Sequence, residues 1–124
     1  MMGTPIVNRM NTVFVHVADL KKSAGWYCKL LGQKVTEPVE NPVYNLIMDG
    51  VTGLTLDAGS CAEGKRPQAG PNPLFNLHTG DIHKAYSWME NEGFAVQAEI
   101  THFDDFSFFN VKDPDGHIIM ICTG

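Results

Sequence analysis

Near the N-terminus, a run of β-branched and aromatic residues is followed by apolar residues at helical spacing. Residues 11–17 are β-branched and aromatic, which favours a strand. Beyond Asp19, apolar residues recur three and four positions apart, as in the buried stripe of an amphipathic helix. This stripe consists of Leu20, Ala24, Tyr27 and Leu31. Asp19 suits the N-cap and Gly32 a left-handed exit, so the pattern predicts a strand followed by a helix.

The same pattern returns in the second half of the chain. A strand is predicted over 74–79, an N-cap at Asp81 and a helix ending at Gly93. The chain has 124 residues, twice 62, and a shift of 62 residues aligns several identical or similar pairs. They are His16 with His78, Asp19 with Asp81, Leu20 with Ile82, Lys22 with Lys84, and Trp26 with Trp88. Since Trp and His are rare residues, we interpret the two halves as a duplication.

Three short strand candidates follow each predicted helix. They cover 34–37, 43–48 and 54–57 in the first copy, and 95–99, 106–112 and 117–122 in the second. Residues 59–73 are rich in Gly, Pro and small polar residues, which indicates a linker. We therefore expect an α+β fold of two βαβββ modules, about 10–58 and about 74–124. Neither half is long enough for a secure core of its own, so a single domain over 1–124 is predicted.

The composition and charge of the chain argue against some classes of binding partner. The chain is 44% hydrophobic and 19% charged, which is typical of a globular domain. Its net charge is −5 and its nine Lys and Arg residues are scattered, so no nucleic acid is expected to bind. No apolar run approaches about 20 residues, so we expect no membrane partner and a cytoplasmic location. Three cysteines without CxxC spacing indicate neither a disulfide framework nor a zinc ribbon.

Two segments carry a resemblance to a known family. Residues 17–32 (V-x-D-L-x-K-S-x-x-W-Y-x-x-L-L-G) and 113–117 (D-P-D-G-H) are similar to the vicinal oxygen chelate superfamily. That superfamily includes glyoxalase I, extradiol dioxygenases, and fosfomycin and bleomycin resistance proteins. The resemblance implies that each module is a curved mixed sheet with a helix on its outer face. It also implies that paired modules enclose a ligand and that the chain forms a homodimer, but one scaffold hosts unrelated reactions.

Enzymes of that superfamily hold a divalent metal with His and Glu side chains at four inward-facing positions, and this chain lacks all four. The corresponding residues here are Thr12, Leu74, Met120, and Gly53 or Leu54. A divalent ion needs imidazole or anionic ligands to offset its dehydration. We therefore expect no metal and no other cofactor at these positions, which resembles the bleomycin resistance type of member.

Strand alternation, phased on those four positions, predicts which side chains line the cup. The lining is mostly apolar and aromatic with a few polar groups, a composition that suits a flat organic ligand. The residues predicted in this way to bind ligand are Thr12, Phe14, His16, Asn76, His78 and Met120. The resemblance adds Asn110, which matches a substrate-contacting position of fosfomycin resistance enzymes, and Phe108 on the same side. The leading hypothesis is a metal-free small-molecule binding protein that sequesters an apolar or aromatic compound.

The roles of His16 and His78 stay open at this point. They occupy equivalent places in the two copies, so they are either a pair that contacts ligand or transfers protons, or inherited structural residues, which we favour. An enzymatic alternative is a lyase, isomerase or oxygenase with a metal relocated to His16, His78 and Asp57, or with a metal-free acid–base site. A third alternative is an interaction module whose cup is filled by Phe14, Phe106, Phe108 and Met120.

Overall fold

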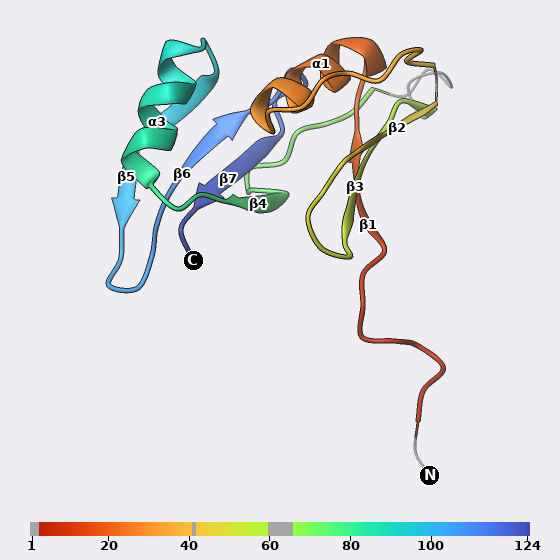
Figure 1. Cartoon of the computed structure of the whole chain (residues 1–124), viewed down its shortest axis with the longest axis horizontal. Coiled ribbons are helices and arrows are strands. Elements are labelled where there is room, and N and C mark those ends of the chain that lie inside the picture. Colours follow the sequence, from red (N-terminus) through yellow and green to blue (C-terminus); the bar gives the residue numbers. More distant parts are fainter. Residues whose placement is uncertain (1–2, 41, 60–65) are drawn as a thin grey trace. The chain divides into compact units, whose positions relative to one another are not determined.

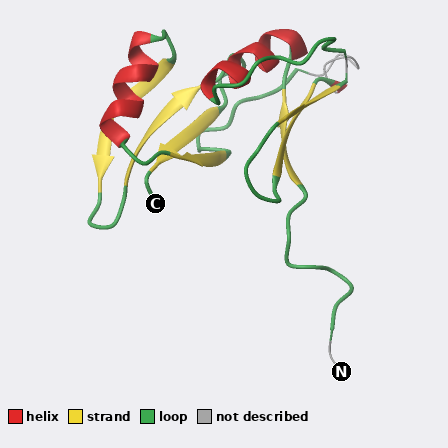
Figure 2. Cartoon of the chain, viewed as in Figure 1, coloured by secondary structure: helices red, strands yellow, loops and turns green. Residues whose placement is uncertain are grey.

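The computed structural model of the chain describes residues 3–40, 42–59 and 66–124. The chain divides into two compact units, residues 1–67 and 68–124, and this boundary lies within the linker range of 59–73. Each unit contains one sheet and one long helix (Figure 1 and Figure 2). The expected α+β fold of two modules is therefore confirmed.

The first module contains strands β1 (Thr12–His16), β2 (Val43–Leu46) and β3 (Gly53–Asp57), and helix α1 (Leu20–Leu30). The strand order is β1-β3-β2, with β1 parallel and β2 antiparallel to β3. Helix α1 begins where the sequence predicts, because the Asp19 carboxylate accepts a hydrogen bond from the Lys22 amide at 3.1 Å. The chain then leaves the helix through Gly32, whose φ is +67°.

The prediction of a strand at 34–37 is wrong. Residues 33–36 form no strand, and the Thr36 amide donates instead to the Tyr44 hydroxyl at 3.0 Å. Beside the end of β2, the Gln33 side chain donates to the Ile47 carbonyl at 2.8 Å and accepts from the Ile47 amide at 3.0 Å. A side-chain amide thus makes the pair of bonds that a neighbouring strand backbone would otherwise make. In its described part, the first module is consequently βαββ rather than βαβββ.

The second module has the full predicted set of elements. It contains β4 (Phe75–His78), α3 (Ile82–Asn91), β5 (Ala95–His102), β6 (Ser107–Lys112) and β7 (Ile118–Cys122), with strand order β4-β7-β6-β5. The Asp81 carboxylate accepts from the Lys84 amide at 3.0 Å, so the second predicted N-cap forms as well. Strand β5 runs three residues past the predicted end. Its register with β6 shifts between Gln97 and Thr101, where Ala98 has a φ of 56°.

Each helix covers one face of the sheet in its own module (Figure 1). In the first module the buried core combines Val15, Leu54 and Leu56 with Leu20, Ala24, Tyr27 and Cys28 of α1. In the second module it combines Phe109, Val111, Ile119 and Ile121 with Ile82 and Met89 of α3. These strand residues alternate with the predicted lining residues, which leaves the latter on the opposite face. Within the described residues, no helix is long and apolar enough to span a membrane.

Candidate functional site

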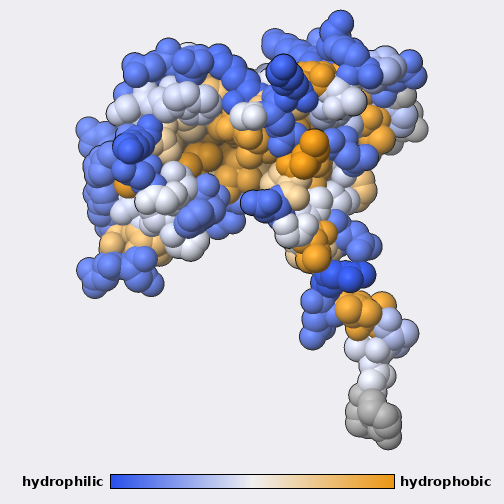
Figure 3. Space-filling view, viewed as in Figure 1, coloured by the Kyte–Doolittle hydropathy of each residue, from blue (hydrophilic) through white to orange (hydrophobic). Residues whose placement is uncertain are grey.

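The predicted lining residues of the second module share the sheet face opposite α3, here called the open face. Strand pairing arranges this face in two adjacent rows. One row runs Asn76, Met120, Asn110 and Gln97, and the other runs His78, Cys122, Phe108 and Thr101. The structure therefore brings five predicted residues together, namely Asn76, His78, Phe108, Asn110 and Met120. Figure 3 shows apolar surface over the second module bordered by hydrophilic residues.

Asn110 provides the least satisfied polar atom of this face. Its side-chain oxygen is buried and accepts no hydrogen bond from the described residues. Its register partner on β7 is Met120, which offers no donor. A buried acceptor without a partner costs about 1–3 kcal/mol, so this atom is suited to a donor supplied by a ligand.

A small open pocket adjoins the same row at the beginning of the edge strand β4. It has a volume of about 300 Å³ and is lined by Pro73, Phe75, Asn76 and Met120. This volume lies at the lower end of the range of about 300–1,000 Å³ found for small-molecule sites. The pocket combines apolar walls with one amide, a combination that favours an uncharged organic ligand.

An aromatic group lies at the other end of the open face. The ring centroid of Phe108 lies 6.1 Å from that of Phe106 and 6.0 Å from that of Phe103, with Phe103 and Phe108 inclined by only 12°. Phe103 belongs to the turn between β5 and β6, and its side chain is 55% exposed. Sequence reasoning missed Phe103, although the spacing of residues 103, 106 and 108 around a two-residue acidic turn was a usable signal.

In the first module, Thr12, Phe14 and His16 share the sheet face opposite α1, as predicted from alternation. The Thr55 hydroxyl on this face donates to Asn45 Oδ1 at 2.7 Å and lies 2.8 Å from the Thr12 hydroxyl. Thr55 and Asn45 were not predicted, because their role depends on how β3 pairs with both neighbours. These hydroxyl and amide groups satisfy one another, whereas the side-chain oxygen of Asn110 in the second module has no partner among the described residues.

The side chains at the four metal positions of the superfamily do not fit a divalent ion. The Thr12 hydroxyl is engaged with Thr55, and Leu54 is buried on the face that α1 covers. Leu74 and Met120 have no carboxylate or imidazole, so the donor set lacks the ligands that such an ion requires.

Neither module by itself contains all three ligands of the relocated metal site, which are His16, His78 and Asp57. His16 and Asp57 are register partners in the first module, whereas His78 belongs to the second. Each module by itself therefore supplies at most two of the three ligands that this alternative requires.

Among the described residues, one group of three potential metal ligands lies close together, at the turn between β6 and β7. It consists of Asp113, Asp115 and His117. The Asp113 carboxylate accepts hydrogen bonds at 2.9 Å from the backbone amides of Asp115 and His117. Gly116 has the positive φ of 85° that the turn requires. Asp113 thus holds the turn, which is the structural role of the D-P-D-G-H segment.

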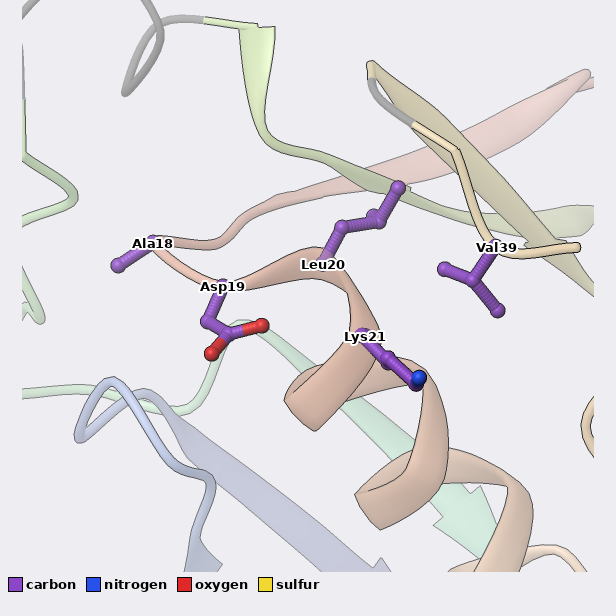
Figure 4. Close-up of a pocket in the computed structure, with 5 residues that line it drawn as sticks. All are labelled: Ala18, Asp19, Leu20, Lys21 and Val39. Carbon is purple, nitrogen blue, oxygen red and sulfur yellow. The ribbon is translucent and has the colours of Figure 1, made fainter.

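A second pocket, of about 310 Å³, lies at the beginning of α1. It is lined by Ala18, Asp19, Leu20, Lys21 and Val39, and Figure 4 shows the Asp19 carboxylate and the Leu20 side chain pointing in different directions. The Asp19 carboxylate already caps α1 and Leu20 is buried in the core. Because its acidic group serves the helix, this pocket is a weaker candidate than the open face.

Comparison with known proteins identifies the family. Residues 9–121 match the sequence model described as the Glyoxalase/Bleomycin resistance protein/Dioxygenase superfamily. Among solved structures, a superfamily member from Sphaerobacter thermophilus has a TM-score of 0.73 at 20% identity, covering 95% of this chain and 98% of its own. No curated protein is similar enough in sequence to count as a relative.

Two further solved structures carry names that refer to activities. Lactoylglutathione lyase from Agrobacterium tumefaciens has a TM-score of 0.71 at 14% identity and covers 98% of this chain and 96% of its own. Oxidase ChaP-H1 has a TM-score of 0.68 at 23% identity and covers 95% and 97%. At these identities the likeness shows a shared fold, and the two names show how varied the chemistry on that fold is.

Proposed function

Because the chain belongs to the Glyoxalase/Bleomycin resistance protein/Dioxygenase superfamily, we propose that it binds a small, flat and largely apolar organic molecule without a metal. The superfamily hosts several reactions, so membership alone does not select one, and the proposal rests on the residues of the open face. The proposed role of the protein is to sequester the bound compound, as proteins of the bleomycin resistance type do.

The observation that carries this proposal is the buried side-chain oxygen of Asn110, which has no hydrogen-bond partner among the described residues. It lies between Met120 and Gln97 in the first row, beside the row that contains Phe108. A single acceptor between Met120 and Gln97, beside the Phe108 ring, can fix the orientation of a ligand that is otherwise held by apolar contact.

The neighbouring residues have complementary roles in this proposal. The Phe108 ring offers a face for stacking, and the flexible Met120 side chain adapts to the ligand's outline. Asn76, at the rim of the small pocket, supplies an exposed amide that can both donate and accept. Thr12, Phe14 and His16 lie on the equivalent face of the first module, and we propose that they contact ligand there.

An enzymatic alternative is favoured by one observation, the presence of His78 in the same row as Phe108. An exposed imidazole beside a bound ligand can transfer protons near neutral pH without a metal. Replacement of His78 by Gln separates the two functions. Only the enzymatic function needs an imidazole at this position. Under the binding proposal, the ligand is recovered chemically unchanged after incubation with the wild-type protein and with the variant alike.

The binding proposal is tested by thermal unfolding of the chelator-treated protein with a panel of neutral planar aromatic compounds. A ligand at 100 times its dissociation constant stabilises the folded state by about 2.7 kcal/mol, which raises the unfolding temperature. We expect stabilisation by at least one compound, loss of most of it in Asn110→Leu, and retention in Asn91→Leu, a control at the exposed end of α3. The proposal is wrong if no compound stabilises the protein, or if both variants respond as the wild type does.

A further inference from the structure

Two histidines lie side by side on the second module, away from its open face. The ring centroids of His83 and His102 are 5.5 Å apart, and the rings are inclined by 33°. Both side chains are exposed. His102 pairs with Ser107, which precedes Phe108, so strand alternation places His102 on the face that α3 covers. This pair is therefore separate from the residues on which the proposed function rests.

The backbone holds both histidines at defined positions. His83 is the second residue of α3, whose first turn is fixed by the Asp81 cap. His102 is the last residue of β5 and pairs with Ser107 across the ladder. The Ser107 amide in turn donates to the Thr123 hydroxyl at 3.0 Å. Ordered elements thus present the two imidazoles to solvent from adjacent positions.

A hydrogen bond selects which nitrogen of His102 faces outward. His102 Nδ1 lies 2.7 Å from the Ser107 hydroxyl oxygen. When Nδ1–H donates to this oxygen, the lone pair resides on Nε2. Metal-binding histidines commonly have this arrangement, in which the second ring nitrogen donates to a neighbouring acceptor and so fixes the tautomer and the ring orientation.

We propose that His83 and His102 together bind a divalent transition-metal ion, with water completing its coordination. When one ion bonds two imidazole nitrogens at about 2.0–2.1 Å each, the ring centres lie roughly 5 Å apart. The observed separation of 5.5 Å is close to this requirement. Imidazole ligands favour Ni²⁺, Cu²⁺ and Zn²⁺ over Mg²⁺ and Ca²⁺, so the site is selective for the former class.

Titration calorimetry with Ni²⁺ on the full chain tests the pair. We expect one ion per chain, and a dissociation constant at least about tenfold higher in both His83→Gln and His102→Gln, because each removes one of two chelating nitrogens. The double variant loses the site altogether. His78→Gln is the matched control, since His78 is an exposed histidine on the other sheet face, and it keeps the wild-type affinity.

Ser107 is a positioning residue in this proposal, and its test is separate. Ser107→Ala weakens Ni²⁺ binding several-fold and Ser107→Thr restores it, while the unfolding temperature identifies any variant that fails to fold.

In proton NMR spectra, paramagnetic Ni²⁺ broadens the imidazole signals of His83 and His102 before those of His16 and His78. The proposal is overturned if either single His variant binds like the wild type, or if His78→Gln weakens binding equally. Equal binding by all variants means an adventitious ion only, and also overturns it.

Discussion

Asn45 and Asn110 are the residues that best distinguish the two sheet faces. Both lie opposite the helix of their own module, and both are paired within a sheet. Asn45 Oδ1 accepts a hydrogen bond from Thr55, whereas Asn110 Oδ1 is buried without a partner among the described residues. The resemblance to the superfamily predicted the face of Asn110 from sequence. The missing partner depends on atoms from neighbouring strands, which a sequence pattern does not place.

This difference predicts opposite effects of the same substitution on stability. Asn110→Leu removes an unsatisfied acceptor, so the free energy of unfolding without ligand stays the same or rises, by up to about 1 kcal/mol. Asn45→Leu removes the acceptor of the Thr55 hydroxyl and lowers that free energy by about 0.5–1.5 kcal/mol. Urea denaturation of the two variants measures both changes. A clear loss of stability in Asn110→Leu would show that its oxygen is already satisfied in the folded protein.

At the scale of the element, local signals account for both helices. Each begins at an aspartate whose carboxylate bonds the amide three residues on, and each is followed by a glycine with positive φ. These signals lie within a few residues, so the sequence reveals them. The absent strand at 34–37 was not predictable in this way. The Gln33 side chain occupies the position beside the end of β2, because it bonds the backbone of Ile47, fourteen residues away.

The two N-caps give an element-scale prediction. Asp19→Ala and Asp81→Ala each remove the acceptor of one helix amide and lower the free energy of unfolding by about 1 kcal/mol. Asp→Asn at the same positions retains an acceptor oxygen and restores most of the loss. Circular dichroism during denaturation reports the change, and an alanine variant as stable as the wild type would argue against a capping role.

The side chain of Gln33 holds the end of β2 in the first module. Gln33→Leu removes both bonds to Ile47, so the end of β2 frays and the Ile47 amide exchanges its hydrogen faster with solvent. The Asn110 amide, inside the second module's sheet, keeps its exchange rate. NMR measurement of amide hydrogen exchange tests this prediction. An unchanged exchange rate of the Ile47 amide would mean that another group accepts its hydrogen bond.

At the scale of the whole molecule, duplication explains the fold better than the function. The two halves share a capped helix on a mixed sheet, but only the second has all four predicted strands in the described residues. The superfamily's metal positions carry Thr12, Leu74, Met120 and Gly53 or Leu54, which is readable from the sequence alone. The side-chain contacts on each face could not be predicted from the sequence. Phe103 contacts Phe108 from a turn, and Thr55 contacts Asn45 through the pairing of two strands.

Assembly is also a whole-molecule property, and we propose a homodimer. Strands at the edges of both sheets, such as β2 and β5, leave backbone groups that a second copy can cover. Sedimentation equilibrium is expected to give twice the chain mass of 13.7 kDa at micromolar concentration. A mass of 13.7 kDa throughout the concentration range would contradict the dimer and leave the ligand site of the second module untouched.

The most direct test of ligand binding at the open face is a titration followed through methionine methyl signals. Met120 lies on the open face, whereas Met89 lies on the buried side of α3 and is only 2% exposed. With labelled methionine methyl groups and a chelator present, a compound that stabilises the protein should shift the Met120 signal in a saturable way and leave Met89 in place. A Met120 signal that stays fixed while other signals shift, or that shifts only when a divalent metal is added, would contradict the account.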